Sequence, residues 1–148
     1  MMEPLAGRVV LTLCTALIAL ALPGGATSFP PPALIPHDVT LHMNDGVDLA
    51  GTLWLPSSSP PQGGFPAIVF FHGLGGKRQD LDRVVPSVAG PNQFIALSFD
   101  ARGHGQSGGL VSVDGPREIA DTRAVFNWLA AQPNVNPKRI GAWGLSLG

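Results

Sequence analysis

Three short apolar segments, separated by helical patterns, constrain the fold of this chain more than any other feature of its sequence. They cover residues 67–71, 94–99 and 139–143, and they lack the strict alternation of a strand with one wet face. Uninterrupted apolar runs of this length are typical of strands buried on both faces, as in parallel sheets covered by helices. The sequence therefore predicts three such strands in a mostly parallel sheet.

Helical patterns lie between these strands. Residues 78–89 carry apolar side chains at helical spacing, although Pro86 interrupts them. Residues 116–131 form a clearer helix, with Asp114 as the expected N-cap. The expected apolar stripe of the second helix is Ile119, Thr122, Phe126 and Leu129. Alternation of buried strands with amphipathic helices indicates an α/β fold.

An earlier pair of segments predicts a β-hairpin. Residues 37–43 and 47–55 alternate between apolar and polar or small side chains, and Asn44-Asp45-Gly46 between them is a tight-turn sequence. Residues 56–66, with four prolines, three serines and two glycines, form a surface loop. The expected order is β-β-β-α-β-α-β.

The first 28 residues have the composition of a secretory signal peptide. Arg8 precedes an apolar run over residues 9–22, and small residues follow it. This run is shorter than the roughly 20 residues of a membrane-spanning helix, so we expect cleavage after Ala26 or Ser28 and no stable membrane span. The expected organisation is a signal peptide at 1–28, a Pro-rich lead-in at 29–36 and a folded domain at 37–148, secreted or extracytoplasmic.

The charge and cysteine content of the chain give no sign of a polyanionic partner or of a disulfide framework. The nine Lys and Arg are scattered and the net charge is −1, which gives no reason to expect nucleic acid as a partner. Cys14 is the only cysteine and lies in the segment expected to be removed, so the mature part has no intramolecular disulfide. No cofactor and no metal are expected.

Residues 144–148 read Gly-Leu-Ser-Leu-Gly directly after the third buried strand. A G-x-S-x-G sequence in this place is typical of a nucleophile elbow, a strained strand-to-helix turn that presents a serine above a sheet. Gly144 and Gly148 supply the space that such a turn needs. Ser146 is therefore the candidate catalytic nucleophile.

Three other glycine-rich patterns are weaker. Residues 103–108 match G-x-G-x-x-G, but a loop follows them and the acidic residue expected about 20 positions on is missing. The pair Gly76-Lys77 lacks the rest of a P-loop. Residues 105–109 also match G-x-S-x-G, but Ser107 is separated from its strand and no helical pattern follows, which places it in a loop.

Residues 72–76, His-Gly-Leu-Gly-Gly, follow the first buried strand, a position from which a loop can contribute to an oxyanion hole. We expect the backbone N–H groups of Leu74 and Leu147 to be the two donors. His72 and Gly73 are expected to shape this loop, and His72 is not expected to be the catalytic base.

Together these motifs resemble the α/β-hydrolase superfamily. The resemblance rests on residues 72–75, 100–107 and 143–148. The opening hairpin and residues 121–148 make the chain most similar to the Xaa-Pro dipeptidyl-peptidase-like hydrolases. The resemblance covers about residues 38–148, and it implies an α/β-hydrolase fold that is truncated at the nucleophile elbow.

The resemblance also implies two-step acyl transfer on Ser146, with a histidine as base and water hydrolysing the acyl-enzyme. In this fold the acid and then the histidine follow the serine along the chain. All four histidines precede it: His37, His42, His72 and His104. We therefore interpret His104, Asp100 and Arg102 as residues that fix a loop, and the chain as an N-terminal fragment without the acid and the histidine.

Substrate class stays open. The true dipeptidyl peptidases resemble one another in a tyrosine hydroxyl at the oxyanion loop and often in a tyrosine after the nucleophile, whereas this chain has no tyrosine and carries Leu74 and Leu147 there. A small-molecule ester and a peptide are equally compatible substrates. The alternative to an enzyme is a non-catalytic hydrolase-like domain that binds a ligand through the same cleft.

We predict that residues 29–148 alone are marginally folded and show no triad-dependent hydrolysis of an activated ester. The strand at 139–143 would be an open edge, and the acid and histidine would be missing. Ester hydrolysis by the purified segment that Ser146→Ala abolishes would contradict this. Sequencing the coding region past Gly148 should find a late Asp or Glu followed by a His.

Overall fold

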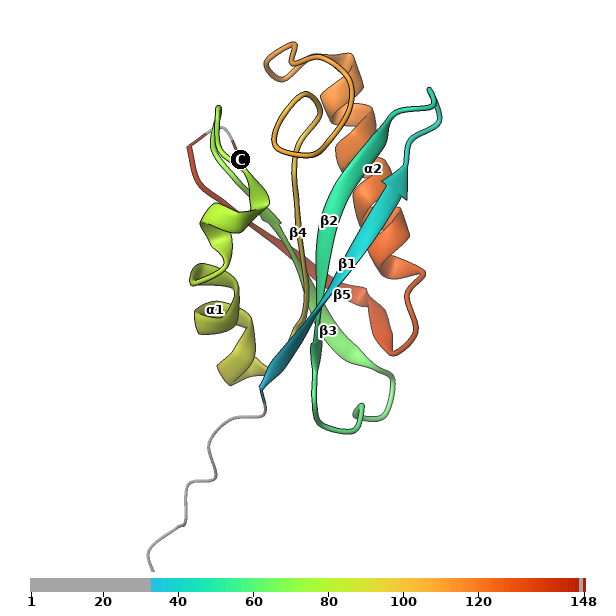
Figure 1. The fold of residues 1–148 in the computed structure, drawn as a ribbon. Helices are drawn as coiled ribbons and strands as arrows, with labels where there is room; N and C mark the ends of the chain where they lie inside the picture. The colour runs from blue at the N-terminus through green and yellow to red at the C-terminus, as the bar shows by residue number, and fades with distance from the viewer. Residues whose placement is uncertain (1–32, 147) are drawn as a thin grey trace, which may run out of the picture.

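A mixed five-stranded sheet organises the residues that the computed structural model describes, 33–146 and 148 (Figure 1). The strand order is β1-β2-β4-β3-β5. The strands are β1 (Leu34–His42), β2 (Asp48–Pro56), β3 (Phe65–Phe71), β4 (Ile95–Phe99) and β5 (Val135–Gly144). β3 pairs in parallel with β4 and β5, whereas β2 pairs antiparallel with β1 and β4. The predicted α/β fold with an N-terminal hairpin is confirmed, and the sheet is mixed because the hairpin joins it antiparallel through β2.

The N-terminal segments test the expected organisation only in part. The signal peptide expected at 1–28 lies outside the described residues. Residues 34–36 of the expected lead-in already belong to β1, where they pair with the end of β2. Within the described part of the chain, no helix has the length and apolar character to cross a membrane.

The sheet has a helix on each side (Figure 1). A 3-10 turn, η1 (Arg78–Leu81), precedes α1 (Val84–Asn92) on one side, and α2 (Pro116–Ala130) covers the other. The prediction of one helix over residues 78–89 was wrong. Proline lacks an N–H and is best tolerated in the first turn of a helix. Pro86 lies in the first turn of α1, which begins at Val84, and a second proline, Pro91, lies near the end of the same helix.

The start and the buried face of α2 also differ from the prediction. Its N-cap is Gly115, because Asp114 has a φ of 56° and lies in the left-handed region. The buried residues are Asp121, Val125 and Leu129, spaced four apart, whereas Ile119 of the predicted stripe is 48% exposed. Hydropathy alone could not place Asp121 on the buried face, because its burial depends on a distant arginine.

The core consists of two clusters, one on each face of the sheet. β3 and β4 are buried on both faces, as their apolar sequences predicted. The α2 side contains Leu41, Leu49, Val69, Ile95, Leu97, Val125 and Leu129. The α1 side contains Trp54, Ile68, Phe70, Leu81, Val85, Ala89 and Ala96. Burial of these apolar side chains is the dominant stabilising contribution.

β5 does not share this burial. Among residues 33–146 and 148 it lies at one edge of the sheet and pairs with β3 alone. Arg139, Gly141 and Ala142 are exposed, so the prediction of a strand buried on both faces is wrong for β5 within the described residues. The edge position itself was expected.

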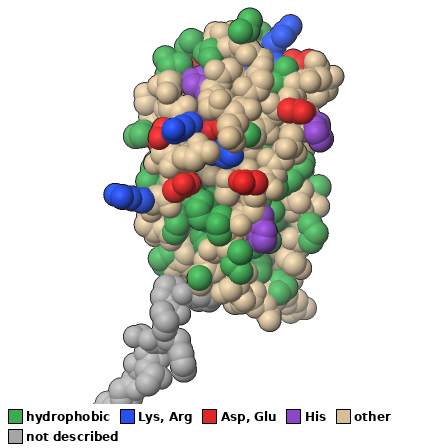
Figure 2. All heavy atoms as spheres, in the orientation of Figure 1, with side chains coloured by type: hydrophobic (Ala, Val, Ile, Leu, Met, Phe, Trp, Pro, Cys, Tyr) green, Lys and Arg blue, Asp and Glu red, His purple; other side chains and the backbone are tan. Residues whose placement is uncertain are grey.

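Charged side chains are interspersed over the molecular face seen in Figure 2, where acidic and basic groups alternate among apolar and polar ones. A single-sign field strong enough to attract a polyanion would need such charges to cluster. The visible face therefore matches the scattered charge of the sequence.

We expect Leu129→Ala to lower the free energy of unfolding by about 2–5 kcal/mol, because it leaves a cavity between α2 and the sheet. The matched control is Ile119→Ala in the same helix, which should change it by less than about 0.5 kcal/mol. Urea unfolding of the two variants measures the difference. Similar losses would show that Ile119 packs against the core as Leu129 does, contrary to its observed exposure.

Candidate active site

The turn that carries Ser146 follows β5 directly. Ser146 has a φ of 60°, a left-handed conformation that costs a non-glycine residue energy. The Leu145 N–H donates to the Phe71 carbonyl (3.3 Å), and the Gly148 N–H donates to the Leu145 carbonyl (3.0 Å). A Cβ at Gly144 would collide with the Gly148 carbonyl group. The backbone therefore has the strained strand-to-turn form that the G-x-S-x-G sequence predicted.

Two further glycines let the loop after β3 approach this turn. A Cβ at Gly148 would lie 2.7 Å from the Phe71 carbonyl oxygen, closer than real Cβ atoms come. A Cβ at Gly73 would lie 3.3 Å from the Ser146 Cβ. The absence of side chains at these positions places the start of the loop against the serine.

Residues 73–76 form a tight turn at this point. The Gly76 N–H donates to the Gly73 carbonyl (3.0 Å), and Gly75 has a φ of 76°, as the third position of a type II turn requires. The Gly75 N–H donates to His104 Nε2 (3.1 Å). Among residues 33–146 and 148 the Leu74 N–H has no hydrogen-bond acceptor. Of the two predicted oxyanion donors, the Leu74 N–H thus has no acceptor among the described residues and lies near Ser146. Leu147 lies outside the described residues.

His72 is buried, and both of its ring nitrogens make hydrogen bonds. Nε2 accepts a hydrogen bond from the Ala101 N–H (3.0 Å) and must therefore be unprotonated. Nδ1 then carries the proton and donates to the Gly73 carbonyl (2.8 Å). Because neither nitrogen is available to a serine hydroxyl, His72 is not placed to act as a base.

The other three histidines are also placed away from such a role. His104 uses Nε2 for the Gly75 N–H and Nδ1 for the Arg102 carbonyl (3.1 Å). His42 pairs with Asp48 on the hairpin (2.6 Å), and His37 is exposed on β1. The geometry thus agrees with the chain order in assigning no base among these residues.

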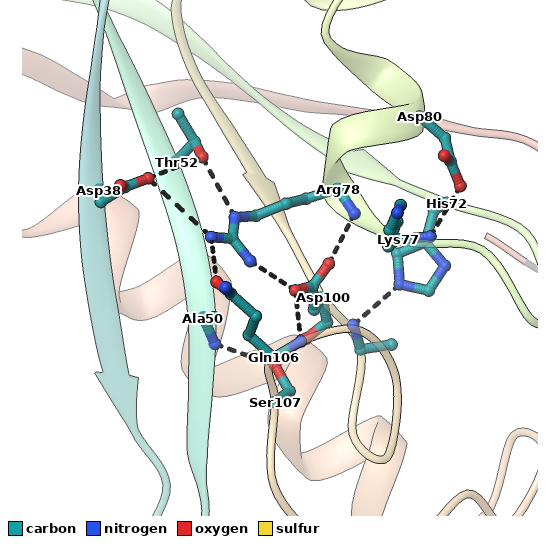
Figure 3. Close-up of polar contacts among 11 residues, drawn as sticks. Asp38, Ala50, Thr52, His72, Lys77, Arg78, Asp80, Asp100, Gln106 and Ser107 are labelled. Carbon is teal, nitrogen blue, oxygen red and sulfur yellow. Dashed lines mark hydrogen bonds and ion pairs between the residues drawn. The ribbon is translucent and has the colours of Figure 1, made fainter.

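A buried ion pair fixes the loop that follows β4 (Figure 3). The Asp100 carboxylate is fully buried and accepts from the Arg78 N–H (2.6 Å), the Arg78 guanidinium and the Gln106 N–H (2.9 Å). The same guanidinium donates to Gln106 Oε1 (2.7 Å) and Thr52 Oγ1 (3.3 Å). Sequence analysis identified Asp100 as loop-fixing but missed Arg78, because 22 residues separate the pair and no local spacing links them.

A second buried arginine holds the same loop to α2. Arg102 donates to both oxygens of Asp121 (2.8 and 2.6 Å) and to those of Asp45 (2.8 and 3.2 Å). Hydrogen bonds to Asp121 and then Asp45 raise the pKa of Arg102. The sequence did contain a signal for this contact: Asp121 falls on the same helix face as Val125 and Leu129. A carboxylate on a buried face needs a partner.

Ser107, the serine of the rival G-x-S-x-G sequence, lies in this loop as predicted. Its hydroxyl donates to the Asp100 carbonyl (2.6 Å) and accepts from the Ala50 N–H (2.9 Å). Because this hydroxyl both donates and accepts a hydrogen bond, it connects the loop to β2. It is not presented to a ligand in the way that Ser146 is.

A groove beside Ser146 runs between the end of β5 and the start of α1. Its apolar lining comes from Leu74, Leu81, Val84, Trp143 and Leu145. Leu74 and Leu145 are each more than half exposed although they are large and apolar. Within the described residues, no group of three or more His, Cys, Asp or Glu side chains could hold a metal ion. The groove can therefore receive an apolar group next to a strained serine.

We expect Asp45→Asn to lower stability at pH 7 but not in acid. The pKa of Asp45 is lowered, chiefly by its hydrogen bond with Arg102, so its stabilisation is present above the unfolded pKa of about 3.9 and is lost as pH falls through the lower folded pKa. Chemical unfolding from pH 7 to pH 2 should show the difference from the parent protein disappear. The exposed Asp82→Asn is the control, and an equal pH trend in both variants would contradict the assignment.

Known proteins resemble the chain in sequence and in structure. Residues 45–148 match the family described as X-Pro dipeptidyl-peptidase (S15 family). Thiohydrolase aneE of Aspergillus aculeatus is 32% identical over 104 residues, 69% of this chain and 31% of that protein. An uncharacterized protein of Mycobacterium tuberculosis is 35% identical over 112 residues, 76% of this chain and 38% of that protein. The chain thus spans about a third of the length of these relatives.

A solved structure gives the same fold. The esterase Pf2001 of Pyrococcus furiosus superimposes with a TM-score of 0.61 at 28% identity, over 78% of this chain and 44% of the esterase. The match extends the sequence similarity to the arrangement of strands and helices described above.

Proposed function

The chain belongs to the X-Pro dipeptidyl-peptidase (S15) family of α/β hydrolases, and we propose that it is part of a serine hydrolase that cleaves an ester or amide bond through an acyl-enzyme on Ser146. The observation that carries this proposal is the strained φ of Ser146 beside the Leu74 amide, which has no acceptor within the described part of the chain. A strained nucleophile next to an open donor is the arrangement that acyl transfer requires.

In the proposed mechanism, Ser146 Oγ bonds to the carbonyl carbon while a histidine accepts the serine proton. The N–H groups of Leu74 and Leu147 stabilise the negative charge that develops on the carbonyl oxygen. The leaving group departs with that proton, and water then hydrolyses the acyl-enzyme. The histidine and its acid would follow Ser146 in the chain, as in other α/β hydrolases.

The proposed substrate is a small molecule with an apolar group beside the scissile bond. The groove next to Ser146 supports this, because Leu81, Val84 and Trp143 offer it an apolar wall. An oxyanion hole made only of backbone donors makes no special demand for a proline peptide. An esterase and a thiohydrolase among the similar proteins favour ester-like substrates.

We also propose that residues 1–28 direct the protein out of the cytoplasm and are then removed. Their basic, apolar and small-residue order supports this. N-terminal sequencing of the mature protein should begin at residue 27 or 29, and an intact Met1 on the exported protein would contradict cleavage.

We predict that Ser146→Ala in the full-length protein lowers hydrolysis of p-nitrophenyl acetate by at least about 10³-fold, because the nucleophile is lost. Ser107→Ala is the matched control: it should keep kcat and lose stability, since the Ala50 N–H loses its acceptor. Mass spectrometry should find a fluorophosphonate label on Ser146 alone. Equal activity in the parent and Ser146→Ala would refute the proposal, and bound ligand without hydrolysis would support a non-catalytic domain.

A further inference from the structure

Two loops exchange backbone hydrogen bonds through a pair of histidines. His72, in the loop after β3, accepts from the Ala101 N–H of the loop after β4. His104, in the loop after β4, accepts from the Gly75 N–H of the loop after β3. The two ring centroids lie 5.0 Å apart. This reciprocal pair, His72 and His104, is referred to below as the histidine clasp.

The His104 side of the clasp is held rigidly. Its N–H donates to the Ala101 carbonyl (2.9 Å), and its carbonyl accepts from the Ser107 N–H (2.9 Å), so the residue joins two consecutive turns. The ring Nδ1 donates to the Arg102 carbonyl. Because Arg102 is itself anchored to α2, the imidazole has a fixed position from which to hold a neighbour.

The clasp fixes the two peptide groups on either side of the Leu74 side chain. The Gly73 carbonyl, which shares a planar peptide with the Leu74 N–H, accepts from His72 Nδ1 and from the Gly76 N–H. The carbonyl and the N–H of a trans peptide point in opposite directions, so fixing the former also aims the latter. The next peptide group, between Leu74 and Gly75, is fixed by the hydrogen bond from the Gly75 N–H to His104 Nε2.

We propose that the histidine clasp aims the Leu74 amide at the oxyanion, and that His104 is a positioning residue for this purpose. The inference rests on the proposed function of Ser146. His104 contacts neither Ser146 nor the substrate in this scheme. It acts by accepting one hydrogen bond from the turn that carries the donor. Small errors in the position of such a donor reduce the rate of the chemical step rather than substrate binding.

The test compares His104→Gln with His104→Leu in the full-length protein. The Gln side-chain oxygen can accept a hydrogen bond near the Nε2 position, whereas Leu fills similar space without an acceptor. We expect His104→Leu to lower kcat about 10–100-fold, a fall no larger than the one caused by removing an oxyanion donor. KM should change less than about threefold. Gln should restore most of kcat. His42→Leu, on the exposed hairpin, is the control for loss of a histidine and should leave kcat unchanged.

Two measurements separate positioning from a folding defect. Fluorophosphonate titration of Ser146 counts intact sites, so kcat is expressed per reactive serine. Hydrogen exchange of residues 73–76 should become faster in His104→Leu and stay slow in His104→Gln. Faster exchange with unchanged kcat per site, or equal loss of kcat in both variants, would overturn the positioning role.

The outcomes also separate this inference from the proposed function. If Ser146 takes no label and Ser146→Ala keeps its activity, the hydrolase assignment fails and the positioning role fails with it. If Ser146 is labelled and essential but His104→Leu is as active as the parent protein, only the positioning role is overturned.

Discussion

The buried ion pair between Asp100 and Arg78 is the interaction on which the arrangement of the site depends. Asp100 directly follows β4, and its carboxylate accepts hydrogen bonds from both the backbone and the guanidinium of Arg78 at the start of η1. The loops after β3 and β4 are thereby brought together, and the histidine clasp crosses the same gap. Removing one partner of such a buried pair costs about 3–5 kcal/mol, because the other charge is left uncompensated. A change at Asp100 would therefore disturb the turn at residues 73–76 without contacting it.

The sequence predicted those parts of the fold that depend on local pattern. The apolar runs of β3 and β4 and the Asp-Gly turn of the hairpin were correct, because burial on both faces and a tight turn each restrict composition locally. The predictions failed where a distant partner or a single backbone preference decided the outcome. Pro86 lies in the first turn of α1 and not inside a longer helix, and Arg102 drew Asp121 into the buried face of α2. Hydropathy assigns a carboxylate to solvent and cannot anticipate an arginine 19 residues away.

The same distinction between local and distant determinants applies to the candidate site. The elbow could be predicted because Gly144, Ser146 and Gly148 are a few residues apart and the turn itself needs them. His72 accepts from the Ala101 N–H and His104 from the Gly75 N–H, each 29 residues away in the sequence. No spacing of residues in the sequence predicts these two hydrogen bonds. Expecting these two histidines to be structural was possible from chain order. Which backbone groups they hold, and that they do so reciprocally, required the fold.

The parallel pairing of β3 with β5 has a geometric consequence for the site. One strand leads into the turn that carries the Leu74 amide and the other into the turn that carries Ser146, and Phe71 pairs with Gly144 just before both. The distance between Ser146 and the Leu74 amide is therefore determined by strand register. A slip of one residue would move Ser146 by about 3.3 Å along the sheet and turn successive side chains to the opposite face. Gly73 and Gly148, where a Cβ would crowd the facing turn, allow the two strand ends to approach closely in the observed register. The distance between Ser146 and the Leu74 amide is thus set by backbone pairing and does not depend on any side-chain contact.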